Sequence, residues 1–265
     1  MKKVLIVATL FFVCVLSLAE TPKANKVAEP RTPTAQCSFE FTSGKSTSFL
    51  KFCVTANGNV TLFETPSGHE HIAVGQDGEG YGVCDLLTVT DYHDYAEFGD
   101  SGNWRPPVLL SQSTKSVKIA RTTIDGVWTL TQTFMQDAAT PSVKVTMALT
   151  NNGQFERGAV LLRYANVDAD GVFDNKFDAT LNSAMAWNSI DSPNPFGVEL
   201  RDAAHSTFIH GAFVQNVAAG PDPCHSDLHT KPGPLVGVDG AIFEVYTFDV
   251  QSGQTRTVSV SYKGL

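Results

Sequence analysis

The chain has 265 residues, with 19 Lys and Arg, 27 Asp and Glu, and a formal net charge of −8 at pH 7. Nucleic acids and anionic membranes are bound through an excess of Lys and Arg, so this balance argues against both as partners. The length fits one large β domain or two small ones.

The N-terminus has the pattern of an export signal. Lys2 and Lys3 form a charged head, residues 4–18 are almost all apolar, and small residues precede an expected cleavage after Ala19. The apolar run is shorter than the roughly 20 residues that cross a bilayer, so we expect a cleaved signal over 1–19 rather than an anchor. The mature chain would carry 17 basic and 27 acidic residues, a net charge of −10, and would be extracellular or periplasmic.

Residues 20–36 contain Pro, Lys, Ala, Thr and Glu with few apolar side chains, which predicts a flexible linker. A single domain then spans 37–265. Four cysteines remain after signal removal, and in an oxidising compartment an even number indicates disulfides. Three pairings are open; we favour Cys37 with Cys53 and Cys84 with Cys224, because the first pair would tie the entering chain to the first clear strand.

Short β-type runs separated by turn residues follow from Cys37 onward. Asn57-Gly58 predicts a type I′ hairpin that sets Phe52 opposite Phe63 and Lys51 opposite Glu64. Asp125-Gly126 predicts a second hairpin with Val117 opposite Phe134.

The later runs alternate between apolar and polar residues in the same way. Residues 143–149 are expected to turn back through Asn151-Asn152-Gly153 into 160–165, and residues 242–250 to pair with 257–262. Ala212 to Ala219 is predicted to form a short helix. These runs predict an all-β fold, a large antiparallel two-sheet sandwich of roughly 12 to 14 strands.

The segment from Phe52 to Val60 and the turn Pro66-Ser67-Gly68 resemble the opening of the galactose-mutarotase-like β-supersandwich. More broadly, the chain resembles secreted bacterial β-sandwich proteins. The resemblance implies epimerase chemistry with histidines and a glutamate base, but none of these can be placed on a residue of this sequence. No catalytic residue is therefore assigned.

Aromatic and acidic residues gather between 77 and 104 among glycines. Such residues form sugar platforms, where rings stack on aromatic faces and carboxylates accept hydroxyl groups. Ordinary half-buried aromatic residues between β turns are the alternative. The candidate ligand-binding residues are Asp85, Asp91, Tyr92, Tyr95 and Trp104.

Oxygen-bearing residues alternate before Gly171, as in a loop that wraps Ca²⁺. The candidate ligands are the side chains of Asn166, Asp168, Asp170 and Asp174 and the carbonyl of Val172. Three aspartates within seven residues repel one another, and a bound cation would relieve this repulsion. The alternative is a solvated turn, in which Asp and Asn bond their own backbone.

Two other motifs point to enzymes. His69-Glu70-His71 could present two imidazoles to zinc, but no third ligand is identifiable, so a polar edge strand is favoured. Gly99-Asp100-Ser101-Gly102 matches the nucleophile segment of chymotrypsin-like proteases, yet no histidine in the required context precedes it.

The sequence favours a secreted, non-enzymatic sandwich that binds extracellular glycan or another surface polymer. One alternative is a carbohydrate-active enzyme of epimerase or glycosidase type, using carboxylates such as Asp85, Asp91 or Glu244. The other is a purely structural envelope protein. Composition leaves the oligomeric state open.

Overall fold

The computed structural model describes residues 36–72, 78–96, 99–137, 140–188, 195–217, 219–225 and 233–265. The predicted signal peptide and all of the predicted linker except Gln36 lie outside these ranges. Eighteen strands and two short 3₁₀ turns, η1 (Ser46–Ser48) and η2 (Ala169–Gly171), make up the regular structure of the described part.

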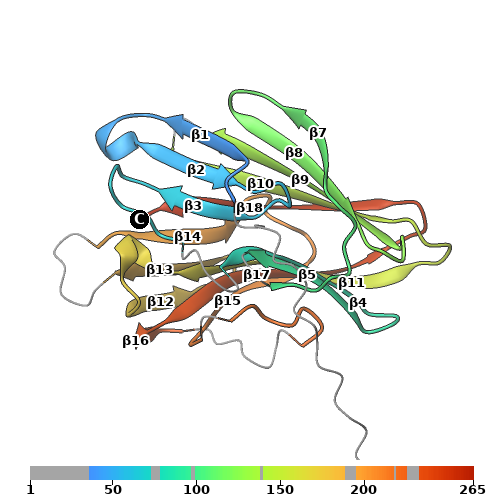
Figure 1. Ribbon diagram of the computed structural model, residues 1–265. Coiled ribbons are helices and arrows are strands. Elements are labelled where there is room, and N and C mark those ends of the chain that lie inside the picture. Colours follow the sequence, from blue (N-terminus) through green and yellow to red (C-terminus); the bar gives the residue numbers. More distant parts are fainter. Residues whose placement is uncertain are drawn as a thin grey trace, which may run out of the picture. The chain divides into compact units, whose positions relative to one another are not determined.

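The strands form three antiparallel sheets (Figure 1). The three-stranded sheet has the order β1 (Phe39–Ser43), β2 (Leu50–Val54) and β3 (Val60–Glu64). The nine-stranded sheet has the order β16 (Leu235–Val238), β12 (Asn175–Ala179), β13 (Ser183–Asn188), β14 (Gly197–Asp202), β18 (Thr255–Gly264), β10 (Ser142–Asn151), β9 (Trp128–Asp137), β8 (Ser116–Thr122) and β7 (Val108–Gln112). The six-stranded sheet has the order β15 (Ile209–Gln215), β17 (Gly240–Val250), β11 (Arg157–Val167), β4 (Glu79–Asp85), β5 (Thr90–Ala96) and β6 (Gly99–Asp100).

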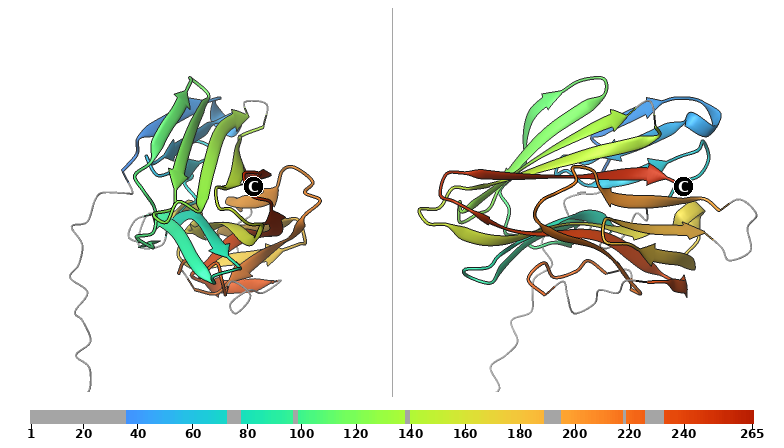
Figure 2. Two further views of the ribbon diagram at one scale, coloured as in Figure 1. Left: turned by 90° about the vertical axis from the view of Figure 1, so that its right-hand side faces the viewer. Right: turned by 180° about the vertical axis from the view of Figure 1, so that it is seen from behind.

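The two larger sheets stack face to face, as the view from behind in Figure 2 shows. Their inward side chains, among them Val145 and Val260 from one sheet and Val83 and Leu161 from the other, belong to one buried cluster. The predicted all-β sandwich is therefore confirmed. The structure has more strands than expected because very short ones, such as β6, carry too few residues to show an alternating pattern.

The three-stranded sheet packs one face into the same core. Phe41, Phe52 and Phe63 lie side by side across it, so the predicted pairing of Phe52 with Phe63 is confirmed. The predicted type I′ turn is wrong, because only Gly58 has a positive φ, at 93°. Its N–H donates to the Thr55 carbonyl instead, and a bulge at Thr61 of β3 adjusts the register.

Two predicted hairpins are in fact arches between the large sheets. β10 continues into β11 through residues 152–156, and β17 continues into β18 through 251–254, but neither pair shares a sheet. The arches bond to one another: the Gly253 N–H donates to the Asn151 carbonyl at 2.8 Å. Alternation predicted each strand correctly, but it carries no information about which sheet a strand joins. The Val117–Phe134 pairing of β8 and β9 is as expected.

The predicted helix at 212–219 is wrong. Residues 209–215 form the edge strand β15, which pairs with β17 over its full length. Ala212 and Val214 alternate into the core, and this burial outweighs the helix propensity of Ala.

Both favoured disulfides, Cys37–Cys53 and Cys84–Cys224, are present. The second holds the segment 219–225 on the outer face of the six-stranded sheet. There the Tyr95 hydroxyl donates to the Pro221 carbonyl at 2.7 Å, and Gly220 approaches the Tyr95 ring so closely that a Cβ would clash. Within the described residues, no helix is long and apolar enough to span a membrane.

A buried ion pair joins the three sheets. Arg163 of β11 and Glu79 of β4 are both fully buried, with Nη2 2.8 Å from Oε2. From the nine-stranded sheet, Gln132 accepts a hydrogen bond from Arg163 Nη1 at 2.6 Å, and the Tyr262 hydroxyl donates to Glu79. From the turn that connects β2 and β3 of the three-stranded sheet, the Gly58 carbonyl accepts a hydrogen bond from Arg163 Nη2. Each polar atom of the pair therefore fixes the position of another sheet.

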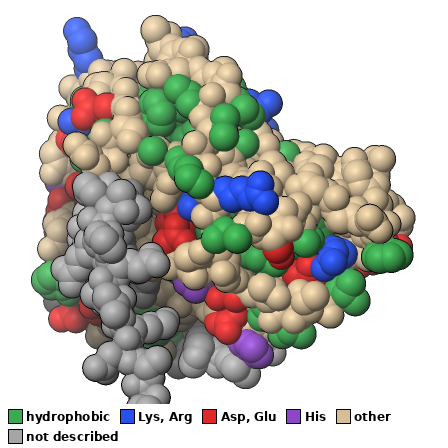
Figure 3. Space-filling view, turned by 45° about the vertical axis from the view of Figure 1, so that its right-hand side comes forward, with side chains coloured by type: hydrophobic (Ala, Val, Ile, Leu, Met, Phe, Trp, Pro, Cys, Tyr) green, Lys and Arg blue, Asp and Glu red, His purple; other side chains and the backbone are tan. Residues whose placement is uncertain are grey.

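Strand β7 forms one edge of the nine-stranded sheet. Val108, Leu109 and Leu110 of this strand are each about half exposed. Figure 3, which brings this side of the molecule forward, shows hydrophobic side chains gathered near its top.

We expect Arg163→Met to lower the free energy of unfolding by about 3–5 kcal/mol, because it leaves the Glu79 carboxyl buried without its cation. Urea denaturation at neutral pH measures this loss. Lys118→Met, on the exposed side of β8, is the matched control and should change stability by less than about 0.5 kcal/mol. Equal stability of the two variants would show that the pair does not hold the sheets together.

The buried carboxyl group of Glu244 in β17 should make the stability of the fold depend on pH. It is fully buried, and neither carboxyl oxygen makes a hydrogen bond of normal geometry within the described part. Burial, and then the charge of Asp202, raises the pKa of Glu244 to about 8. The unfolded chain ionises near pH 4.5, so the stabilising contribution of the neutral acid is full below that pH and is lost as pH rises through 8.

Thermal unfolding should therefore show wild-type stability falling between pH 5 and 8 by up to a few kcal/mol. In Glu244→Gln, which keeps the shape but cannot ionise, this part of the fall should be absent. Parallel pH profiles for the two proteins would contradict the assignment.

Candidate functional site

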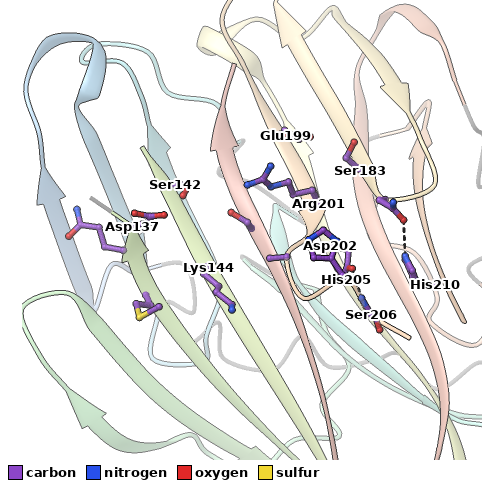
Figure 4. Close-up of a pocket in the computed structure, with 15 residues that line it drawn as sticks. Asp137, Ser142, Lys144, Ser183, Glu199, Arg201, Asp202, His205, Ser206 and His210 are labelled. Carbon is purple, nitrogen blue, oxygen red and sulfur yellow. Dashed lines mark hydrogen bonds between the residues drawn. The ribbon is translucent and has the colours of Figure 1, made fainter. Parts of the chain in front are cut away.

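A groove of about 690 Å³ lies on the outer face of the nine-stranded sheet (Figure 4). Five adjacent strands, β9, β10, β18, β14 and β13, form its floor, and the segments near 182 and 203–210 form its rim. The residues that line it are Met135, Gln136, Asp137, Ser142, Lys144, Asn182, Ser183, Glu199, Arg201, Asp202, Ala203, His205, Ser206, His210 and Ser261. Most of the floor residues occupy the outward positions of strands whose inward positions build the core.

Register places one row of these side chains directly across the sheet. Lys144 is opposite Ser261, and Ser261 is opposite Arg201. The neighbouring strands place Met135 and Ser183 at the two ends of this row. In Figure 4, Lys144 and Arg201 accordingly lie on either side of β18. Two cationic groups thus flank a serine hydroxyl on the groove floor.

Two of the groove carboxylates are already used within the fold. Asp202 is buried; its Oδ2 accepts the Ser206 N–H at 2.7 Å and its Oδ1 accepts the Tyr246 hydroxyl at 3.1 Å. Asp137 accepts a hydrogen bond from the Thr140 hydroxyl. Glu199 is half-buried and makes no ion pair or hydrogen bond with any described residue. Of the three carboxylates, Glu199 is the one that remains available to a ligand.

The rim contributes two histidines. His205 is exposed and has a positive φ of 49°, a left-handed conformation that is uncommon for a residue with a side chain. Asp202 holds the turn that contains it. His210 contacts Asn182 Oδ1 through Nε2 and the Phe208 carbonyl through Nδ1, both at 2.9 Å. Both ring nitrogens of His210 are thus already bonded, so the exposed imidazole of His205 is the one that the rim adds to the polar and charged groups of the floor.

The sequence-predicted ligand residues lie elsewhere. Tyr92 and Trp104 are buried in the main core, and Asp85 is fully buried, where it accepts the Trp128 indole N–H. Tyr95 is buried beneath the segment 219–225, and Asp91 contacts His93 Nδ1 at 2.6 Å. These residues do not share one concave surface, and their buried rings do not offer a face to a sugar.

The residues that do share a surface were partly visible in the sequence. Lys144 belongs to the polar side of an alternating strand, which correctly indicated an outward position. Nothing in that pattern distinguishes open solvent from a groove, because the groove exists only once β10 lies beside β18 and β14.

Residues of the predicted calcium loop are largely bonded to the protein. Asp170 Oδ1 lies 2.8 Å from His69 Nδ1, and its Oδ2 accepts from Asn188. The Val172 carbonyl accepts a hydrogen bond from Asn175, whose side chain closes the loop. Asp174 is exposed.

Two of the candidate ligand oxygens, Asn166 Oδ1 and Asp168 Oδ1, are buried without partners in the described part, as is Asn175 Oδ1. Burial, and then the charge of Asp239, raises the pKa of Asp168 to about 6. No group of three His, Cys, Asp or Glu side chains is placed to hold a metal among the residues described. Calcium binding at this loop stays a prediction, with Asn166 and Asp168 as its best remaining ligands.

The histidines of the His69-Glu70-His71 motif are separated in space. His69 stacks on Phe196 beside Asp170, whereas His71 is buried with Nε2 2.7 Å from the Thr65 carbonyl. Glu70 accepts two backbone N–H groups, and burial raises its pKa to about 7. These contacts are those of a structural turn.

Comparison with known proteins shows similarity in structure alone. No family model matches the chain, and no curated protein does. Among solved structures, the chain is similar to a bacterial glucoamylase in complex with acarbose, with 12% identity and a TM-score of 0.60; the match covers 90% of this chain and 34% of that one. The chain thus spans about a third of that protein.

Two similar structures are closer to this chain in length. One is a putative aldose 1-epimerase from Escherichia coli K12, with 12% identity, 86% and 99% coverage of the two chains and a TM-score of 0.46. The other is a galactose mutarotase-like protein from Lactobacillus casei, with 10% identity, 86% and 100% coverage and a TM-score of 0.48. A structure described as galactose mutarotase-like, the class that the sequence resembles, is thus among those similar to this chain, at 10% identity.

We expect Ca²⁺ to raise the melting temperature if it binds the loop in the folded state, because a ligand that binds only that state stabilises it. Asp168→Asn, which removes the charge but keeps the shape, should abolish the rise, whereas Asp249→Asn, at the exposed position of β17, should not. Identical melting curves in millimolar calcium and in excess chelator, with no heat of binding in calorimetry, would leave only the solvated turn.

Proposed function

We propose that this protein is exported and binds saccharides in the groove on the outer face of the nine-stranded sheet. The observation that carries the proposal is the lining of the groove, which combines serine hydroxyls, amides and imidazoles with the charged groups of Lys144, Arg201 and Glu199. These three charged side chains form no ion pair in the described part. Sugars are recognised by dense hydrogen bonding to such groups.

The fold, the N-terminal sequence and the disulfides are compatible with this role. The same fold occurs in a glucoamylase whose structure contains acarbose, which supports the choice of a carbohydrate ligand. The signal-like N-terminus and the two disulfides support export to an extracellular or periplasmic location.

The spacing of the carboxylates favours binding over hydrolysis. A glycosidase places two carboxyl groups about 5–9.5 Å apart across the scissile bond. Here Asp137 and Glu199 stand on β9 and β14 with β10 and β18 between them, about 14 Å apart at the backbone. Asp137 is also bonded to Thr140, so the pair is poorly arranged for acid and base catalysis.

A glycan array should show binding by the wild-type protein, and Glu199→Ala should weaken it by about tenfold, the loss expected for one charged hydrogen bond. Glu156→Ala removes an exposed carboxylate near the β10–β11 arch and is the matched control. Equal binding by both variants would place the site elsewhere. Release of reducing sugar from a bound glycan would favour the enzymatic alternative, and absence of all glycan binding would favour a structural envelope role.

A further inference from the structure

Lys144 and Arg201 form a matched pair of cations on the groove floor. They occupy the same cross-strand row, with Ser261 between them, so their backbones are about 10 Å apart. Both side chains project from the same face of the sheet. Neither takes part in an ion pair or a side-chain hydrogen bond with any residue of the described ranges.

The three arginines that are buried or half-buried in the fold, unlike the exposed Arg201, are each paired with carboxylates. Arg121 pairs with Asp94 and Asp100, Arg157 pairs with Asp85, and Arg163 pairs with Glu79. The chain has a net charge of −8, so carboxylates are abundant. The two groove cations have nevertheless been left without one, while Asp202 and Asp137 in the same groove are bonded to other groups.

The lining also has no aromatic platform. Its side chains include no Phe, Tyr or Trp. Neutral sugars gain much of their binding energy from stacking on such rings. A ligand of this groove must gain its energy from charge and hydrogen bonds instead. A guanidinium binds a carboxylate or sulfate with two parallel hydrogen bonds, and an ammonium adds a point charge.

From these observations we propose that the ligand is an acidic saccharide whose carboxylate or sulfate groups are bound by Lys144 and Arg201. The Glu199 carboxylate accepts hydrogen bonds from hydroxyl groups of the same sugar. The Ser261 hydroxyl, which lies between the two cations, also hydrogen-bonds to the ligand. This inference rests on the proposed function, because it names the class of saccharide that the groove takes.

The test compares oligosaccharides that differ only in charge. Oligogalacturonate and the same oligomer with its carboxyls reduced to alcohols are titrated into the full-length mature protein by calorimetry, and a sulfated neutral oligomer forms a third arm. We expect the charged oligomers to bind at least tenfold more tightly than the reduced one, with an affinity that falls as salt rises. The arm that binds more tightly identifies carboxylate or sulfate as the preferred group.

Variants connect the preference to the two residues. Lys144→Met and Arg201→Gln should each remove most of the tenfold preference, whereas Lys144→Arg should keep it. Lys118→Met is the control, because Lys118 of β8 lies on the same face of the sheet as Lys144 and Arg201 but outside the groove. Melting curves establish that each variant is folded; all three positions lie on the outer face of the sheet, away from the core.

The possible failures are distinguishable. Tight binding of the reduced oligomer, with no loss in Arg201→Gln, would overturn the acidic specificity but leave saccharide binding in place. Binding of acidic oligomers that Lys118→Met weakens as much as Lys144→Met would show nonspecific charge attraction and overturn the assignment to the groove. No binding of any arm would overturn both this inference and the proposed function.

Discussion

The buried contact between Arg163 and Glu79 is the constraint on which the arrangement of the sheets depends. A guanidinium and a carboxylate removed from water are costly unless every polar atom finds a partner. The partners here come from the other two sheets: Gln132 and Tyr262 from the nine-stranded sheet, and the Gly58 carbonyl from the β2–β3 turn of the three-stranded one. Hydrophobic packing alone would tolerate small shifts between the layers, whereas these directional bonds do not.

The two faces of the nine-stranded sheet have different roles: one packs into the core, and the other lines the groove proposed to bind saccharides. On β10, inward Val143 and Val145 pack into the core while outward Lys144 lines the groove. On β14, inward Leu200 is buried beside outward Glu199 and Arg201. Because neighbouring residues point to opposite faces, the outer side chains can be selected for ligand chemistry at little cost to the fold.

The candidate site could not be located from the sequence alone. The aromatic residues near 80–104 have the composition of a sugar platform, yet Tyr92 and Trp104 pack in the core. Aromatic side chains are both good stacking surfaces and good core residues, so composition could not separate the two roles. The groove residues are common surface types, distributed over positions from 135 to 261, and no local motif connects them.

The sequence by itself determined the all-β class, the alternation of most strands and the Phe52–Phe63 and Val117–Phe134 registers, because these depend on period-two patterning and nearby turns. Its even cysteine count indicated disulfides but left three pairings open, of which the favoured one is present. Only the tertiary structure decided that β10 and β11 belong to different sheets, that residues 209–215 form an edge strand, and that Lys144, Ser261 and Arg201 share one row. The reason is physical: a strand's own residues specify which face is apolar, but its partners are chosen by contacts between segments far apart in the chain.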